Sequence, residues 1–161
     1  KMNELSDVGR EKTITNDYIR GLVDGEGCFS FSTRPYTNRF GEFVRQRIPS
    51  FTLSMHERDT KLLEKVRDHL KLKNKIYIQK KPNRSDGFQR GRVAVLVVRE
   101  FVQLKDIVIP FFYHGLIGYK KTQFFGWLER IGNDPTVSQK FKFLHWLHSH
   151  GWYEKNKKYV D

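Results

Sequence analysis

The chain has 161 residues, of which 38% are hydrophobic and 30% charged, and this length and composition predict one compact domain. An aromatic content of 14% argues against a disordered tail. The 30 Lys and Arg exceed the 18 Asp and Glu by +12, which indicates a polyanionic partner: nucleic acid first, an anionic membrane surface as the alternative. The longest apolar run, 93–98, is too short to span a membrane. A single cysteine, Cys28, excludes an internal disulfide framework and a zinc site built on cysteine pairs, so we expect an intracellular protein.

Residues 15–55 predict a helix followed by a strand hairpin. Thr15 caps a short amphipathic helix, and the glycine cluster at 25–27 ends it. Residues 28–34 alternate, with Phe29 and Phe31 inward, as in a half-buried strand. Residues 35–41 form the predicted turn, and 42–55 form a second strand that places Phe51 and Leu53 inward.

The pattern of a helix followed by two strands recurs over residues 59–98, and helices follow it. A helix over 59–70 precedes strands over 75–81 and 92–98, which are joined by a turn at 82–91. A helix over 100–109 is expected to end before Pro110, because the residue before a proline disfavours the helical conformation. Two further helices are expected over 120–131 and 137–150, followed by a basic end.

Strands that occur in pairs imply hairpins, so we expect an α+β fold with a four-stranded antiparallel sheet, helices on one face and the other face open. Arg45 and Arg47 share the parity of the inward residues, so either their strand shifts phase near Ile48 and Pro49 or they lie beyond the edge of the core. Residues 71–92 carry eight basic side chains and one acid, typical of a nucleic-acid contact or of a solvated hairpin. The candidate nucleic-acid contacts are Ser30, Ser32, Arg34, Arg45, Gln46, Arg47, Ser50, Thr52, Lys75, Tyr77, Gln79, Lys81, Arg84, Arg90 and Arg92.

The segment 19–27, IRGLVDGEG, is the sharpest local feature of the sequence. Gly21 and Gly25 are four residues apart, so they share one helix face without side chains, to which another backbone can approach closely. Asp24 and Glu26 place two carboxylates at the end of this helix. A carboxylate beside a basic surface is a plausible Mg²⁺ ligand, and an acidic glycine turn that merely closes the helix is the alternative.

The same segment resembles the LAGLIDADG motif of homing endonucleases, and the following Cys28-Phe29 suits the form that ends Gly-Glu-Gly-Cys-Phe. The predicted order of helices and strands is similar to the αββαββα core of that family, whose four-stranded sheet is saddle-shaped. Residues 50–56 and 120–124 are similar to further family segments, so the resemblance spans about residues 15–131.

The resemblance implies roles for individual residues. Glu26 matches the acid that binds the catalytic divalent cation, Mg²⁺ or another such as Mn²⁺, with the Gly25 carbonyl as a companion ligand. Asp24 matches the other acidic position, which packs or caps the helix. Lys120 or Lys121 matches the basic residue near the scissile phosphate. Met55 stands where some members carry a water-ordering glutamine, so the following His56 is the remaining candidate for that role.

One motif per chain implies, within that family, a homodimer whose motif helices pack through Gly21 and Gly25. The implied activity is metal-assisted hydrolysis that leaves a staggered double-strand break in a long, near-palindromic DNA site. We expect one endonuclease domain over 1–161, with a core over about 15–131 and a C-terminal helix and basic tail over 136–161. The alternatives are a maturase that binds intron RNA and a DNA-binding regulator that does not cleave. The sequence leaves open whether the compartment is an organelle or a prokaryotic cytoplasm.

Overall fold

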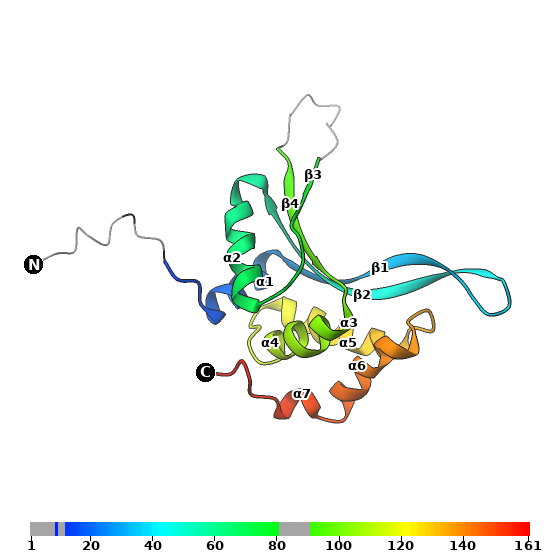
Figure 1. Cartoon of the computed structure of the whole chain (residues 1–161). Coiled ribbons are helices and arrows are strands. Elements are labelled where there is room, and N and C mark those ends of the chain that lie inside the picture. Colours follow the sequence, from blue (N-terminus) through cyan, green and yellow to red (C-terminus); the bar gives the residue numbers. More distant parts are fainter. Residues whose placement is uncertain (1–8, 10–11, 81–90) are drawn as a thin grey trace, which may run out of the picture.

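The computed structural model describes residues 9, 12–80 and 91–161 (Figure 1). Four strands form one antiparallel sheet in the order β1-β2-β4-β3. The strands are β1 (Gly27–Thr37), β2 (Phe43–His56), β3 (Tyr77–Gln79) and β4 (Val93–Val98). The helices are α1 (Asn16–Glu26), the 3₁₀ turn η2 (Glu57–Asp59), α2 (Thr60–Leu70), α3 (Phe101–Gln103), the π-helical turn η3 (Leu104–Val108), α4 (Ile109–Tyr113), α5 (Tyr119–Asn133), α6 (Gln139–Ser149) and α7 (Trp152–Lys155).

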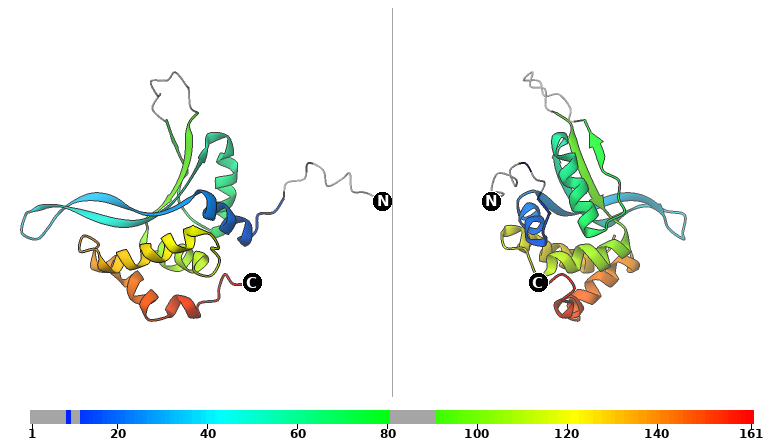
Figure 2. Two further views of the ribbon diagram at one scale, coloured as in Figure 1. Left: turned by 180° about the vertical axis from the view of Figure 1, so that it is seen from behind. Right: turned by 60° about the vertical axis from the view of Figure 1, so that its left-hand side comes forward.

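The helices lie on one face of the sheet, as predicted, and the other face is open. The β1–β2 hairpin and the β3–β4 hairpin diverge, and the first extends past the helices (Figures 1 and 2). No helix in the described parts of the chain has both the length and the apolar character needed to cross a membrane.

Aromatic side chains join the sheet to the helices. The Phe29 ring lies 5.3 Å from the rings of Phe51 and Trp127 and 4.9 Å from that of Phe124. The Trp127 indole N–H donates to the Ser30 carbonyl at 2.8 Å. Burying aromatic side chains supplies much of the driving force for packing, and this bond fixes α5 against β1.

Helix α1 is held at both ends and along its buried side. The Thr15 hydroxyl accepts the Tyr18 N–H at 3.1 Å, the predicted N-cap. Arg20, although charged, is only 6% exposed. Its guanidinium donates to the carbonyls of Phe111 and Tyr159, at 3.3 and 2.6 Å, and its carbon lies 4.6 Å from the centre of the Phe111 ring. The buried Arg20, which the sequence did not single out, therefore ties α1 to α4 and to the C-terminal segment.

The first hairpin is longer than predicted. Strand β1 continues through Pro35 to Thr37, so the turn is confined to residues 38–42 and the expected turn over 35–41 is wrong. Proline is tolerated here because β1 is an edge strand, where a missing N–H costs no ladder bond. Asn38 closes the turn, its side-chain oxygen accepting the N–H groups of Phe40 and Glu42 at 2.9 Å.

The third strand is shorter than predicted: β3 covers three residues rather than 75–81, of which 81 lies outside the described residues. Tyr77 pairs with Val95, so a strand that began at Lys75 would place Lys75 opposite Val97. There the side-chain N–H of Asn74 donates to the Val97 carbonyl at 2.8 Å. A side chain thus takes the carbonyl that a longer β3 would reach, and the edge strand begins later.

The predicted helix end before Pro110 is also wrong. Helical backbone runs without interruption from Phe101 to Tyr113. The Ile109 N–H bonds to the Leu104 carbonyl, five residues back, in the π-helical turn η3. A π-turn shifts the hydrogen-bond register just before the proline, where a regular helix would meet both a clash and a missing donor. The last long helix, α6, begins at Gln139 rather than at Val137.

Gly27 offers a test of the junction between α1 and β1. A Cβ on Gly27 would lie 2.5 Å from Val23 Cγ1 and 2.9 Å from the Val23 carbonyl oxygen. Gly27→Ala is therefore expected to lower the free energy of unfolding by about 1–3 kcal/mol, measured by urea denaturation. Gly126→Ala is the control, since a Cβ there meets nothing within 4 Å and the change should raise stability by up to about 1 kcal/mol. Equal effects of the two substitutions would contradict the steric explanation.

Candidate nucleic-acid interface and catalytic centre

The strand register arranges the open face in rows. One row across the strands is Cys28, Thr52 and Val97, and another is Ser54, Val95 and Tyr77. Farther out, the paired rows are Ser30 with Ser50, Ser32 with Ile48, and Arg34 with Gln46. The opposite rows carry buried core residues such as Phe51 and Leu96. Apart from Arg45 and Arg47, the predicted polar residues of β1, β2 and β3 therefore share one face.

Not every residue of this face is accessible. Arg34, Tyr77 and Gln79 are exposed, and Arg34 donates to the Gln46 side-chain oxygen at 3.4 Å. Ser50 has the expected orientation but is only 2% exposed, with its hydroxyl 3.4 Å from that of Ser30. The remaining predicted residues of this face, Ser30, Ser32, Gln46 and Thr52, are half-buried.

Strand β4 contributes valines that the sequence analysis did not assign to the open face. Val93, Val95 and Val97 lie in the rows of His56, Ser54 and Thr52. The run 93–98 is apolar on both sides, so alternation could not show that one side faces outward. Val95 is only 4% exposed, whereas Val93 and Val97 are half-buried, so the open face combines polar donors and acceptors with two partly accessible valines. Aliphatic side chains suit the methyl group of thymine.

The structure shows on which side of the sheet the Arg45 and Arg47 side chains lie. The pairing of β1 with β2 runs without a bulge from Gly27↔Leu53 to Thr37↔Phe43, so there is no phase shift. Both arginines keep the parity of Phe51 and lie beyond the edge of the core, on the side of the helices. Arg47 Nη1 lies 2.8 Å from Asp134 Oδ2. Hydrogen bonds from Thr136 and Arg47 lower the pKa of Asp134 to about 2.

The two acids of the motif have different environments. Asp24 is half-buried, and its carboxylate accepts the Ile117 N–H at 3.0 Å and the Gly118 N–H at 3.1 Å. Glu26, the last residue of α1, is exposed, and no hydrogen bond or ion pair to its carboxylate is found within 12–80 and 91–161. Asp24 thus has a structural partner on each oxygen, while Glu26 is free to bind a ligand.

Asp24 also brings the two lysines to the same end of the molecule. Gly118 is the N-cap residue of α5, and Lys120 and Lys121 lie in the first turn of that helix. The bonds from Ile117 and Gly118 to Asp24 therefore fix the beginning of α5 against the end of α1. Two cations and the positive end of a helix dipole lie at this site, an arrangement that attracts phosphate.

The donors at the end of α1 fit a divalent cation only in part. Glu26 supplies one unpaired carboxylate, and the Gly25 carbonyl belongs to the last helical turn, where carbonyls lack an intrahelical partner. Mg²⁺ takes about six oxygen ligands. No cluster of three or more His, Cys, Asp or Glu side chains suitable for a metal occurs in the described part of the chain. A cation held by Glu26 and Gly25 would complete its shell with water, phosphate oxygens or a second chain.

The remaining candidates fall into three groups. His56 already has a structural role, since its Nδ1 accepts the Arg58 N–H at 3.1 Å and its ring adjoins Gly91. Lys75 and Arg92 are exposed at opposite ends of the β3–β4 hairpin: Lys75 precedes β3, and Arg92 directly precedes β4 on the side of the turn. Lys81, Arg84 and Arg90 lie outside the described residues.

One side of α1 is not covered by any of the residues that the structure describes. A Cβ built on Gly21 or Gly25 would meet nothing within 4 Å. Exposed apolar side chains occur on this helix and on the loop that Asp24 binds: Tyr18 is 51% exposed and Ile117 91%. Ile117 was missed by the sequence analysis because a lone isoleucine between two loop residues gives no periodic signal.

Comparisons with known proteins point in one direction. A family described as LAGLIDADG endonuclease matches residues 19–131. The protein "Probable intron-encoded DNA endonuclease 1" of Mycosarcoma maydis is 33% identical over 94 residues, which are 58% of this chain and 31% of that protein. The chain thus matches about a third of the length of this curated relative.

The fold is also similar to solved structures of homing endonucleases. The homing endonuclease I-TnaI shares 23% identity and a TM-score of 0.56, with 83% of this chain and 84% of that chain covered. The LAGLIDADG homing endonuclease I-LtrWI, solved bound to target DNA, shares 27% identity and a TM-score of 0.54 over 81% of this chain and 41% of that chain. The meganuclease I-CpaMI, bound to uncleaved DNA, has a TM-score of 0.60 at 19% identity over 90% of this chain and 44% of that chain. These similarities confirm the predicted fold.

Replacing Asp24 tests its part in this arrangement. Asp24→Ala leaves the Ile117 and Gly118 N–H groups without their acceptor, so we expect stability to fall by about 1–3 kcal/mol and hydrogen exchange at both amides to quicken. Asp17→Ala is the control, since it removes an acid from the same helix whose side chain is 87% exposed and makes one ion pair at 3.4 Å. That change should cost less than about 1 kcal/mol. Unchanged exchange at residues 117 and 118 in Asp24→Ala would refute the connection.

Proposed function

Because the chain belongs to the LAGLIDADG endonuclease family, whose match covers residues 19–131, we propose that it is a homing endonuclease that binds and cleaves double-stranded DNA. The observation that carries this proposal is that Asp24 holds the beginning of α5, with Lys120 and Lys121, against the end of α1, where the carboxylate of Glu26 has no partner among the described residues. Positive charge and an open polar sheet face support DNA as the substrate.

The open sheet face is the surface for reading the DNA sequence. A two-stranded ribbon fits the major groove of B-DNA, where each base pair shows a distinct pattern of donors and acceptors. Arg34, Gln46 and Gln79 supply hydrogen-bonding side chains of the types that read such patterns. The half-buried Val93 and Val97 of β4 supply apolar contacts on the same face.

Cleavage is assigned to the end of α1. Glu26 and the Gly25 carbonyl would hold Mg²⁺ or a similar divalent cation. When bound, such an ion polarises a phosphoryl oxygen and lowers the pKa of its water. The ammonium group of Lys120 or Lys121 would stabilise the negative charge that develops on the phosphoryl oxygens. Asp24 contributes by position alone, since its two oxygens are occupied by backbone N–H groups.

Two copies of the domain are needed to cut both strands, and the uncovered face of α1 is the proposed contact between them. Gly21 and Gly25 allow two helices to approach closely. The two Glu26 carboxylates would then lie close together and repel each other unless cations bind between them. A two-fold axis at this contact matches a near-palindromic site and a staggered cut, one in each strand.

The role of Glu26 is tested by Glu26→Gln. This change keeps the shape and removes the charge, so we expect loss of cleavage of the host-site duplex in Mg²⁺ or Mn²⁺, with duplex affinity changed less than about threefold. Glu64→Gln on the exposed side of α2 is the matched control and should cleave normally. Retained cleavage by Glu26→Gln would overturn the metal assignment, and an intact duplex with the unmodified protein would overturn the proposed activity.

The proposed dimer is tested by Gly21→Leu. The side chain meets open space within the chain, so the fold should be kept while the close helix contact is blocked. We expect sedimentation to show a dimer for the unmodified protein and a monomer for Gly21→Leu, with cleavage reduced at least a hundredfold. Gly126→Leu, an exposed helical glycine on α5, is the control and should remain a dimer. A monomeric unmodified protein would contradict the homodimer.

A further inference from the structure

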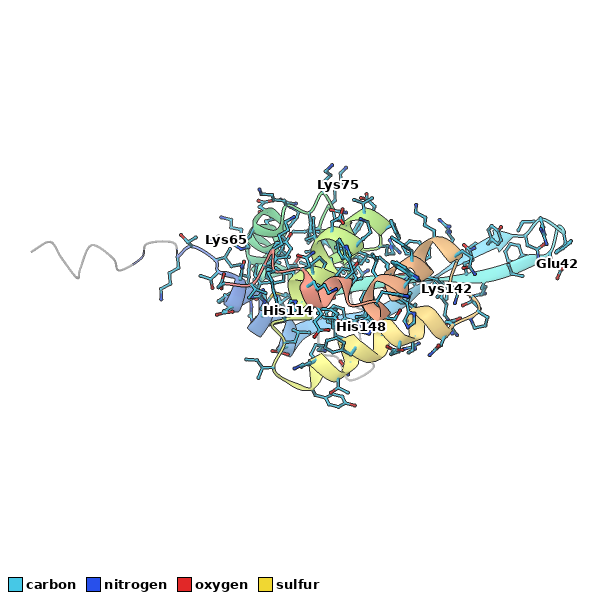
Figure 3. All side chains as sticks on the ribbon, turned by 90° about the horizontal axis from the view of Figure 1, so that it is seen from below. Glu42, Lys65, Lys75, His114, Lys142 and His148 are labelled. Carbon is cyan, nitrogen blue, oxygen red and sulfur yellow. The ribbon has the colours of Figure 1, made fainter. Side chains whose placement is uncertain are left out.

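The outer part of the β1–β2 hairpin, residues 31–48, is defined as the arm. Strand β2 is buried at Pro49, Ser50, Phe51 and Leu53, whereas residues 43–48 are exposed or half-buried. Figure 2 shows this arm extending past the helices, and Figure 3 shows Glu42 at its outer end. An isolated two-stranded ribbon is marginally stable in water, so the arm needs contacts with the helices to hold a fixed direction.

Arg47 makes two such contacts with the connection between α5 and α6. Its guanidinium donates to Asp134 Oδ2 at 2.8 Å, and its backbone N–H donates to the Thr136 carbonyl at 3.2 Å. The Asp134 side chain is only 9% exposed and that of Arg47 is 50% exposed, so the carboxylate of this ion pair is shielded from solvent and the guanidinium is partly shielded.

The acceptor side of the contact is itself fixed. Asp134 Oδ1 accepts the backbone N–H of Thr136 at 2.8 Å and its hydroxyl at 2.6 Å. The Lys142 ammonium donates to the carbonyls of Gly132 and Asp134, at 3.0 and 2.7 Å. The low pKa of Asp134 keeps its carboxylate charged at any pH near neutrality. The end of α5 is thus a rigid anchor for the arm.

The other end of α5 carries the proposed catalytic residues. Asp24 binds the loop before the helix, and Lys120 and Lys121 lie in its first turn. Asp134 is the C-cap residue of the same helix. A helix of 15 residues is about 22 Å long, so α5 links the cleavage site to the arm as one rod.

We propose that Arg47 and Asp134 are positioning residues, which hold the DNA-reading arm at a fixed angle to the cleavage site and so set specificity at the base pairs under the arm. Arg47 then acts through Asp134 and not by binding DNA itself. This inference rests on the proposed function, and it differs from the sequence-based expectation that Arg47 contacts DNA.

The two possible roles of Arg47 predict different effects of Asp134→Asn on duplex binding. If Arg47 positions the arm, then Arg47→Gln, Asp134→Asn and the double variant should have the same effect, because each breaks the same contact. If Arg47 binds phosphate, Asp134→Asn should release it and strengthen duplex binding, while Arg47→Gln weakens binding. A double-mutant cycle on duplex affinity separates these cases.

For the double-mutant cycle, the affinity of each variant is measured for a set of target duplexes, each with one changed base pair. We expect discrimination to fall about tenfold at outer positions under the arm and to remain at the central positions, in both single variants and equally in the double variant. Arg47→Lys keeps the charge and one donor, so it should restore part of the discrimination. Glu64→Gln controls for the loss of one acid. Additive effects of the two substitutions, or a uniform loss at all positions, would overturn the proposal.

A second measurement needs no DNA. Hydrogen exchange at the amides of residues 43–47 should quicken at least tenfold in Asp134→Asn, while the amides of residues 51–55 keep their protection. Unchanged exchange in the arm would overturn the positioning role of Arg47 and Asp134, even if the protein cleaves DNA. If the protein cleaves no DNA but shows the local exchange effect, the contact between Arg47 and Asp134 still holds the arm, and only the proposed function is contradicted.

Discussion

The arrangement of Glu26, Lys120 and Lys121 depends on the two hydrogen bonds that the Asp24 carboxylate accepts. This carboxylate joins the last turn of α1 to the loop before α5, two segments more than 90 residues apart in sequence. Without these two hydrogen bonds, Glu26 and the lysines of α5 would belong to elements that merely pack against the same sheet. A charged acceptor is suited to this task because it holds two backbone N–H groups at once, more strongly than a neutral acceptor would.

From this junction, contacts at both ends of α5 define the rest of the functional surface. The Trp127 indole fixes the middle of the helix to β1, and Asp134 at its end holds β2 through Arg47. The helices therefore position the sheet through contacts on the side opposite the open face. The side chains of the open face are not used in these contacts and remain available for the proposed DNA binding. Arg20 performs a similar task for α1, where a buried guanidinium binds two carbonyls from distant segments.

Local patterns were sufficient to predict the strands of the first hairpin, the Thr15 cap and the inward side of Phe29 and Phe51. The errors arose where a tertiary contact overrides a local rule. Pro110 does not end its helix because a π-turn shifts the backbone hydrogen-bond register just before it, and β3 is short because the Asn74 side chain occupies a carbonyl of β4. The candidate site was predicted from the motif, whereas the Asp24 bonds, the buried Ser50 and the partner of Arg47 depend on residues far away in sequence, which no periodicity encodes.

The glycines of the motif support the proposed pairing of two domains. Gly27 is required inside the chain, because Val23 leaves no room for a side chain, whereas Gly21 and Gly25 face open space. Glycine inside a helix lowers stability by about 1 kcal/mol relative to alanine, so two of them on an empty face are a cost without a benefit in the isolated domain. A second motif helix packed there would recover that cost through close contact. It would also bring a second Glu26, which supplies the oxygen ligands that one chain lacks for a divalent cation.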